Sequence, residues 1–355
     1  MIYIVIMIFA SVAVYPIRFK NRKNYKIKSK VLSNLLIIIS FLIALLPMGF
    51  RYGIGTDYFY TYYPHFFGIA NGTMKFSEVG FNFLNKVIYD LTGDYRVLFF
   101  VTSFLFLYFL YKGIYENSDN LFISILLIFL AQPYFYGMNM VRQAIAIAII
   151  FSAFKYIKKD KKVIFGIYCI IASLIHSSAI FMIPLILVAN IKLSNKKRII
   201  IVGILMILKP IFSMLVKYII MQTQYAWYYT SRFNTGVTSN LLIIVNIIIF
   251  ILNIFYTSRR YNKKNREYEI LTNINFISLC ILILATDIPL INRLVRYFSI
   301  FQILLLPQIF RQEEESKIRI VIEFFILGML FAVMYYQIIV LKGEQVVPYR
   351  SIFNI

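Results

Sequence analysis

Several apolar runs in this sequence are as long as a membrane is thick. Val31 to Phe50, Leu241 to Tyr256 and Ile320 to Leu341 approach the ~20 apolar residues with which a helix crosses the hydrocarbon core. Backbone groups in lipid must be paired within the element, and these runs lack the alternation of an outer-membrane barrel. With 61% hydrophobic residues and a mean hydropathy of +0.76, the chain is predicted to be an all-α polytopic transmembrane protein.

The formal charge of +22 is gathered in short basic clusters between the apolar runs. This placement is typical of cytoplasmic loops that follow the positive-inside rule and contact anionic headgroups. It argues against nucleic acid as a partner, since the charge follows from topology. The clusters are Arg18 to Lys30, Lys158 to Lys162, Lys192 to Arg198 and Arg259 to Arg266.

Placing every basic cluster in the cytoplasm gives about twelve crossings, with both ends of the chain outside. Basic residues at both ends of residues 163–191 require an even number of crossings there. We therefore expect two short helices that meet at His176, or a re-entrant hairpin. Nothing marks a separate soluble part, so residues 1–355 are predicted to form a single membrane domain. The predicted crossings are residues 1–17, 31–50, 97–115, 121–136, 139–157, 163–176, 178–191, 199–216, 239–257, 270–286, 290–310 and 320–341.

On this path residues 51–96 and 217–240 face outside, and both segments are rich in aromatic residues. Such rings suit the membrane interface and can also stack on sugar faces. Asn85, Lys86 and Asp90 have the spacing of the polar face of a helix, so an amphipathic outer helix is expected. A GT-C-like fold is one candidate for this arrangement.

Ionisable side chains at the outer ends of the predicted helices are the candidates for chemistry, because a charge at the edge of lipid is costly. Arg142 and Gln143 share a helix face with Asn139, and His176 lies at the tip of the short helix pair. Arginine on the outer side runs against the positive-inside bias and calls for a reason. The candidate residues are Arg51, Asp57, Glu78, Arg142, Gln143, His176, Arg293, Arg296, Tyr297 and Arg350.

A diphosphate ligand accounts for several outer arginines. Guanidinium groups offer paired donors to phosphate oxygens and stay charged, so they can hold a polyprenyl diphosphate and stabilise it as a leaving group. Asp57, Glu78 or His176 is then the candidate general base for a sugar hydroxyl. The alternative is that the arginines form internal ion pairs, for example with Asp57 or Asp287, or contact the headgroups.

The sequence lacks the motifs of nucleotide-dependent enzymes. It has no Walker loop, no dinucleotide-binding glycine pattern and no Asp-x-Asp pair for a metal-bound sugar nucleotide. This argues against a nucleotide-driven pump and against a cytoplasmic glycosyltransferase. Cys169 and Cys280 lie in apolar runs and are interpreted as packing residues. We expect no cofactor and a metal-independent reaction.

Six short motifs, in order along almost the whole chain, resemble those of the EpsG family of bacterial exopolysaccharide proteins, which are similar in role to Wzy-type polysaccharide polymerases. The second motif has Val79 where the family more often has proline, which changes loop stiffness more than chemistry. The motifs are RYGIGTDY (Arg51 to Tyr58), EVGFNFLN (Glu78 to Asn85), NMVRQAIA (Asn139 to Ala146), IHSSA (Ile175 to Ala179), NRLVRY (Asn292 to Tyr297) and VPYR (Val347 to Arg350).

The resemblance implies an enzyme of the bacterial cytoplasmic membrane that joins polyprenyl-diphosphate-linked oligosaccharide repeat units into a capsule or exopolysaccharide at the outer face. Its partners would be that lipid-linked oligosaccharide and membrane lipids, with a flippase and a chain-length regulator of the same pathway as further candidates. Three arginines would bind the diphosphate, namely Arg142, Arg293 and Arg296. Arg51 and Asp57 would shape the acceptor site, and His176 would assist proton transfer.

Two other functions use the same features. A flippase for the lipid-linked repeat unit would need a charged path open to each side in turn, whereas the candidate charges gather on one side. A membrane acyltransferase that decorates the polysaccharide would need a catalytic histidine, and His65 and His176 are the only histidines in the sequence. Substitution of both histidines therefore discriminates between an acyltransferase and a polymerase.

Overall fold

The computed structural model describes residues 2–19, 29–188, 191–223, 226, 236–259, 266–285, 291–311 and 317–353. It is 82% helical, and in these ranges the only β pairing is an isolated bridge between Arg51 and Ser351. The chain forms two compact units, Met1–Ile183 with Glu315–Ile355, and Pro184–Glu314. A single membrane domain for the whole chain stays a prediction.

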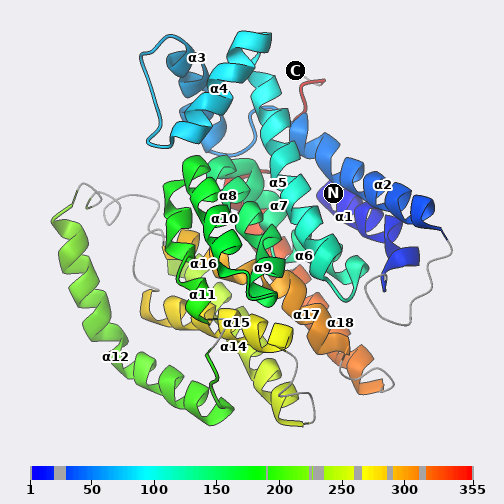
Figure 1. The fold of residues 1–355 in the computed structure, drawn as a ribbon, viewed down its shortest axis with the longest axis vertical. Helices are drawn as coiled ribbons and strands as arrows, with labels where there is room; N and C mark the ends of the chain where they lie inside the picture. The colour runs from blue at the N-terminus through cyan, green and yellow to red at the C-terminus, as the bar shows by residue number, and fades with distance from the viewer. Residues whose placement is uncertain are drawn as a thin grey trace. The chain divides into compact units, whose positions relative to one another are not determined.

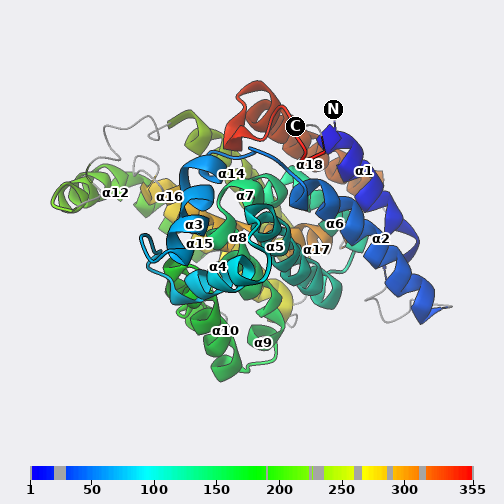
Figure 2. The same cartoon turned by 90° about the horizontal axis from the view of Figure 1, so that it is seen from above.

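The helices of the first unit centre on α5 and α8, with α1 and α2 along one side of α5 (Figure 1 and Figure 2). The helices α3 and α4 lie together near the beginning of α5 (Figure 1). The helices of this unit are α1 (Ile2–Ala13), α2 (Lys30–Gly49), α3 (Tyr63–Ala70), α4 (Val79–Thr92), α5 (Tyr95–Asn117), α6 (Leu121–Leu130), α7 (Pro133–Asn139), α8 (Val141–Ser152), α9 (Phe154–Lys158), α10 (Lys162–Ile175) and α18 (Lys317–Met334). Shorter helical turns are Tyr15–Ile17, Tyr58–Tyr62, Ser177–Met182, Tyr335–Val340 and Gly343–Gln345.

Local sequence explains where these helices begin and how closely they pack. Asp94 caps α5 by accepting a hydrogen bond from the N–H of Arg96, and Asn120 caps α6 in the same way from Ile123. Gly113 lets α5 approach α8, because a Cβ at this position would lie 2.6 Å from the ring of Phe151. All side chains of α8 except that of Arg142 are buried, so α8 lies in the interior of the first unit.

The outer surface of the first unit is strongly apolar along α2. This helix buries small residues such as Ser40 and Ala44 and exposes long aliphatic side chains such as Val31, Leu35 and Ile38. A water-soluble helix has the opposite arrangement. The exposed side of α2 therefore suits contact with lipid.

The second unit consists of α11 (Leu185–Val188), α12 (Asn195–Met221), α14 (Gly236–Arg259), α15 (Arg266–Ala285), α16 (Ile291–Ser299) and α17 (Gln302–Arg311). Buried amides link three of these helices, because the Gln302 Nε2 donates to the Oδ1 atoms of Asn246 and Asn275, both at 2.9 Å. In an apolar environment such bonds hold helices together and exclude other pairings.

In the part of the chain that the structure describes, six helical segments are long and apolar enough to cross a membrane: Lys30–Gly49, Tyr95–Asn117, Asn195–Met221, Arg266–Leu284, Arg293–Phe310 and Ile320–Val340. A seventh would be the pair α6 and α7, which is bent by 48°. The prediction of an all-α polytopic membrane protein is thereby confirmed, while the count of twelve crossings stays a prediction. Residues 162–188 contain two shorter apolar helices, Lys162–Ile175 and Ser177–Val188, as expected for this part of the chain.

The predicted orientation can be tested by cysteine labelling. The sequence places Tyr60, whose exposed fraction is 80%, outside the cell and the exposed Lys159 inside. We expect a Y60C variant to react with a membrane-impermeant maleimide on intact cells, and a K159C variant to react only after the membrane is opened. The two native cysteines provide the background control, because Cys169 is buried and Cys280 is partly buried. Labelling in the reverse pattern would contradict the orientation.

Candidate functional site

The carboxylate of Glu78 is the centre of a polar cluster in the first unit. It lies directly before α4, while Arg142 is the second residue of α8 and His176 directly follows α10. One oxygen, Oε2, accepts from the Arg142 Nη1 at 2.5 Å and from the Ser77 hydroxyl at 2.9 Å. The other, Oε1, accepts from the backbone N–H and the hydroxyl of Ser177, both at 3.2 Å. We call Glu78, Arg142, His176 and Ser177 the Glu78 cluster.

Local sequence brings the start of α4 against the end of α10. Gly80 makes this approach possible, because a Cβ there would lie 2.8 Å from the carbonyl oxygen of Leu174. The loop before Glu78 is fixed by Asn82, whose side chain accepts from the Phe76 N–H at 2.9 Å and donates to the Phe76 carbonyl at 2.7 Å. The motif that begins at Glu78 therefore positions the carboxylate through its glycine and its first asparagine.

The carboxylate of Glu78 stays ionised although its side chain is only 3% exposed. Burial raises its pKa, but His176, Arg142 and the Ser177 N–H act in the opposite direction, and the net result is a pKa well below the ordinary value. The His176 Nδ1 lies 3.2 Å from Oε1, an ion-pair contact without the alignment of a hydrogen bond. A carboxylate held next to an imidazole can orient the ring.

Aromatic rings surround the guanidinium of Arg142. It lies over the ring of Phe76, 4.0 Å from the centroid, and His65 stacks on the same ring at 4.1 Å. The buried hydroxyl of Tyr62 accepts from the Arg142 N–H at 3.3 Å. The side chains of Arg142 and His176 are each 20% exposed, so both reach the surface from an otherwise closed cluster.

Asp57 belongs to a second polar network in the same unit. Its N–H donates to the Asn139 Oδ1 at 3.1 Å, and the Asn139 Nδ2 donates to the Glu344 Oε2 at 2.7 Å. Gly55 permits this arrangement, because its φ is +89° and a Cβ would lie 3.0 Å from the Asn139 Cα. The backbone of Glu344 is also in the left-handed region, with φ of 58°. The carboxylate of Glu344 is a polar group that the sequence interpretation missed.

Arg51 is buried and its guanidinium is held by the protein itself. It donates to the carbonyl oxygens of Met48 at 2.5 Å and Met138 at 3.1 Å, and to the Ser103 hydroxyl at 2.9 Å. Burial lowers its pKa to about 10, so the group is charged at neutral pH. These bonds tie the end of α2 to α5 and α7, and they account for the buried guanidinium without a ligand.

The remaining candidates are not bonded to the Glu78 carboxylate. Gln143 is buried next to Arg142 on α8, and Arg350 is exposed with its carbonyl accepting from the Tyr52 N–H at 3.0 Å. In the second unit α16 carries Arg293 and Arg296, both partly exposed, and the fully buried Tyr297. Asp287 lies outside the described residues.

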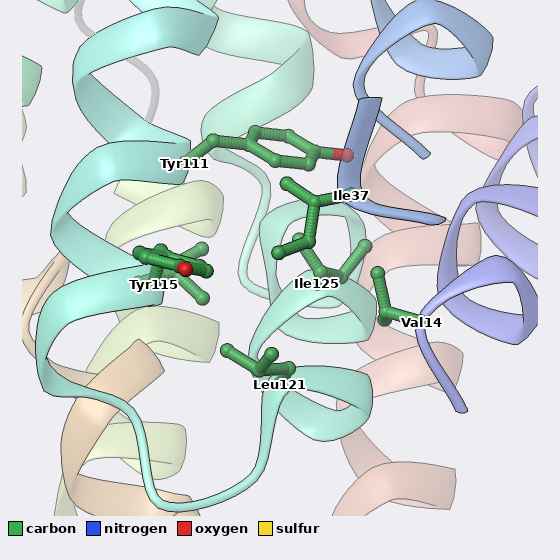
Figure 3. A pocket seen from close by; sticks show the side chains of 7 residues that line it. Val14, Ile37, Tyr111, Tyr115, Leu121 and Ile125 are labelled. Carbon is green, nitrogen blue, oxygen red and sulfur yellow. The ribbon is translucent and has the colours of Figure 1, made fainter. Parts of the chain in front are cut away.

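Two cavities among the described residues lie apart from these polar groups. The first is about 10 Å³, and Figure 3 shows Tyr111 and Tyr115 of α5 facing Ile37, Ile125 and Leu121 around it. A space of this size holds about one water molecule and no sugar. The second cavity, of about 350 Å³, is apolar and belongs to the second unit. The Glu78 cluster, which reaches the surface, therefore remains the candidate functional site.

The fold and the cluster together define a polytopic membrane protein with an ionised carboxylate, an arginine and a histidine held at the surface of a helical unit. The chain belongs to the EpsG family, whose model matches residues 34–351. Members of this family are Wzy-like polysaccharide polymerases, which gives the chain a polymerase-type function in general terms. Searches of curated proteins and of solved structures give no significant match.

The ionised Glu78 is expected to stabilise the first unit. An E78Q variant should be less stable by about 2–3 kcal/mol, because the partly buried Arg142 loses its counter-charge. The matched control is D90N, which breaks the exposed pair between Lys86 and Asp90 and should cost less than about 1 kcal/mol. Thermal unfolding of the purified protein measures both. Equal effects of the two substitutions would show that Glu78 is not the centre of a stabilising cluster.

The same comparison predicts a pH dependence. Because folding lowers the pKa of Glu78 from its ordinary 4.5, ionised Glu78 stabilises the protein above that pH, and this contribution is lost as the pH falls through the lowered pKa. The difference in Tm between the wild type and E78Q should therefore be constant near neutral pH and shrink below 4.5. A difference that grows in acid contradicts the assignment.

Proposed function

We propose that this protein is a polymerase that joins polyprenyl-diphosphate-linked oligosaccharide repeat units at the outer face of the bacterial cytoplasmic membrane. The observation that carries the proposal is the contact between the ionised Glu78 and His176, 3.2 Å apart at a partly exposed position. The family supplies the reaction class. The cluster supplies a base and the group that orients it, which glycosyl transfer to a hydroxyl requires.

In the proposed reaction His176 is the general base. Its Nδ1 lies next to the Glu78 carboxylate, so Nε2 is the nitrogen proposed to accept the proton of the acceptor sugar hydroxyl. The hydroxyl oxygen forms a bond to the anomeric carbon of the growing chain, while the bond from that carbon to the diphosphate oxygen breaks. Polyprenyl diphosphate leaves with the bonding electron pair, and Glu78 stabilises the imidazolium until its proton passes to water.

Arg293 and Arg296 are proposed to bind the diphosphate. They are three residues apart on α16 and therefore lie on one side of that helix. Guanidinium groups at this spacing can contact phosphate oxygens and offset the charge of the leaving group. Tyr297, which is buried, would hold the helix in place for the two arginines. A diphosphate contact of Arg142 stays a prediction, because its Nη1 is already paired with Glu78.

The other candidates take supporting roles in the proposal. Arg51 acts through the carbonyls that it binds, and is thus a positioning residue for the segment that leads to Asp57. Asp57 is proposed to shape the acceptor site together with Asn139. Gln143 is proposed to support Arg142 from the next position of α8, and the exposed Arg350 to contact the anionic substrate. A flippase and a chain-length regulator of the same pathway are the proposed protein partners.

The two histidines provide a direct test of the proposed base. Purified protein in liposomes, given one lipid-linked repeat unit, should produce a ladder of lengthening glycans on a gel. We expect H176Q to reduce the rate of elongation by about 10²-fold or more, because a general base contributes roughly that factor. The matched variant H65Q should retain most of the activity, since His65 contacts the carbonyl of Thr61 and the ring of Phe76.

Other outcomes would contradict the proposed base or indicate a different function. A ladder of normal length from H176Q, at an unchanged Tm, would falsify the role of His176. Substrate that crosses the bilayer without elongation would identify a flippase. Acyl transfer to the glycan by the wild type, lost in both histidine variants, would identify an acyltransferase.

The proposed reaction needs no metal ion. The arginines supply the positive charge that a divalent ion gives to a diphosphate leaving group in other enzymes. Dialysis against a chelator is therefore expected to leave the rate of ladder formation unchanged. A loss of activity that a divalent cation restores would contradict a metal-independent reaction.

A further inference from the structure

The second unit contains an apolar groove of about 350 Å³ between α12 and α14, with one contact from α15. We call it the α12–α14 groove. The volume lies within the range of small-molecule sites, but such sites also contain several polar groups. Here every lining side chain is apolar: Ile199, Val202, Met206, Ile247, Phe250, Ile251, Ile254 and Leu279. The groove therefore suits a hydrocarbon chain.

The two helices give the groove a direction. The Asn195 Nδ2 donates to the carbonyl oxygen of Ile254 at 3.3 Å, so the beginning of α12 lies against the later part of α14. Ile199 and Ile254 mark this end of the groove, while Met206 and Ile247 mark the other. Seven residues separate the two ends on each helix, a length of roughly 10 Å in an α-helix.

The end marked by Ile199 and Ile254 is basic. Lys192, Lys196 and Lys197 are exposed and lie within seven residues of Ile199 in the chain, and α14 continues to Arg259, where the next basic cluster of the sequence begins. The acidic residues at the beginning of α15 are Glu267 and Glu269. Among the described residues here, the exposed lysines Lys192, Lys196 and Lys197 outnumber these two, so the charge favours an anion.

Arg198 differs from the neighbouring lysines. It is buried and donates to the Asn273 Oδ1 at 2.7 Å and to the Asn195 Oδ1 at 3.2 Å. Asn273 in turn donates to the carbonyls of Val188 and Ile191. Arg198 therefore fixes the beginning of α12, whereas Lys196 and Lys197 remain directed to the exterior and available to a ligand.

We propose that the α12–α14 groove binds an anionic glycerophospholipid of the cytoplasmic leaflet, with an acyl chain in the groove and the phosphate at Lys196 and Lys197. Basic residues between membrane helices on the cytoplasmic side are typical of anionic lipid sites. The positive-inside rule predicts that the clusters Lys192 to Arg198 and Arg259 to Arg266 lie on the cytoplasmic side. The proposed polymerase reaction takes place at the opposite face, so this site is separate from that of the lipid-linked substrate.

Native mass spectrometry of the full chain tests the proposal. The protein in detergent is given equal amounts of phosphatidylglycerol and phosphatidylcholine with the same acyl chains. We expect several-fold greater retention of phosphatidylglycerol. The K196Q/K197Q variant should retain the two lipids equally, and V202W, which fills the groove, should retain less of both.

Two control variants match these changes in charge and size. K159Q/K161Q removes two exposed lysines of the first unit, and M214W adds a ring to an exposed position of α12 outside the groove. Both should bind lipid like the wild type. Thermal unfolding reports whether V202W is folded; if it is not, the lysine variant decides the question.

Three results would overturn the proposal. The first is equal retention of the two lipids by the wild type. The second is a phosphatidylglycerol preference that persists in K196Q/K197Q, and the third is displacement of the bound lipid by a polyprenyl phosphate, which would make the groove part of the substrate path.

Discussion

The arrangement of the first unit depends on one buried charge. The carboxylate of Glu78 accepts hydrogen bonds from residues that precede α4, begin α8 and follow α10. An ionised group in this position is stable only while these donors are present, because burial alone would neutralise it. His176 and Arg142, which both contact this carboxylate, are partly exposed. Stability of the unit and geometry of the candidate site therefore rest on the same few atoms.

The sequence was sufficient for the class of fold and for most of the helices. Apolar runs such as Val31 to Phe50 have one physical explanation in lipid, and α2 occupies nearly that range. The number of crossings could not be obtained in this way. Helices such as α1 and α10 are too short to cross unaided, and whether a short apolar helix spans lipid or packs inside the protein depends on tertiary contacts.

Three residues of the Glu78 cluster were candidates from the sequence, but their pairing was not predicted. Glu78, Arg142 and His176 were each selected as costly charges at helix ends, yet Glu78 and Arg142 are 64 residues apart in the chain. Helical periodicity predicts which residues share one face of a helix, and it does not predict contacts between residues so far apart in the chain. Arg51 illustrates the converse. Its predicted position at the outer face suggested a ligand, whereas the carbonyl groups of Met48 and Met138 accept hydrogen bonds from it. Every residue has a backbone carbonyl, so the sequence does not show which carbonyls will accept such bonds.

The pairing of residues 50–55 with residues 345–352 has a consequence for how the chain is made. Tyr52 bonds to Arg350, Ile352 to Phe50, and the hydroxyl of Tyr3 to the carbonyl of Val346. The ribosome completes the earlier partners long before the later ones exist. During that interval the backbone groups of residues 50–55 must remain hydrated at the membrane surface. The segment next to Asp57 is thus finished late, and a product truncated before residue 345 lacks these hydrogen bonds.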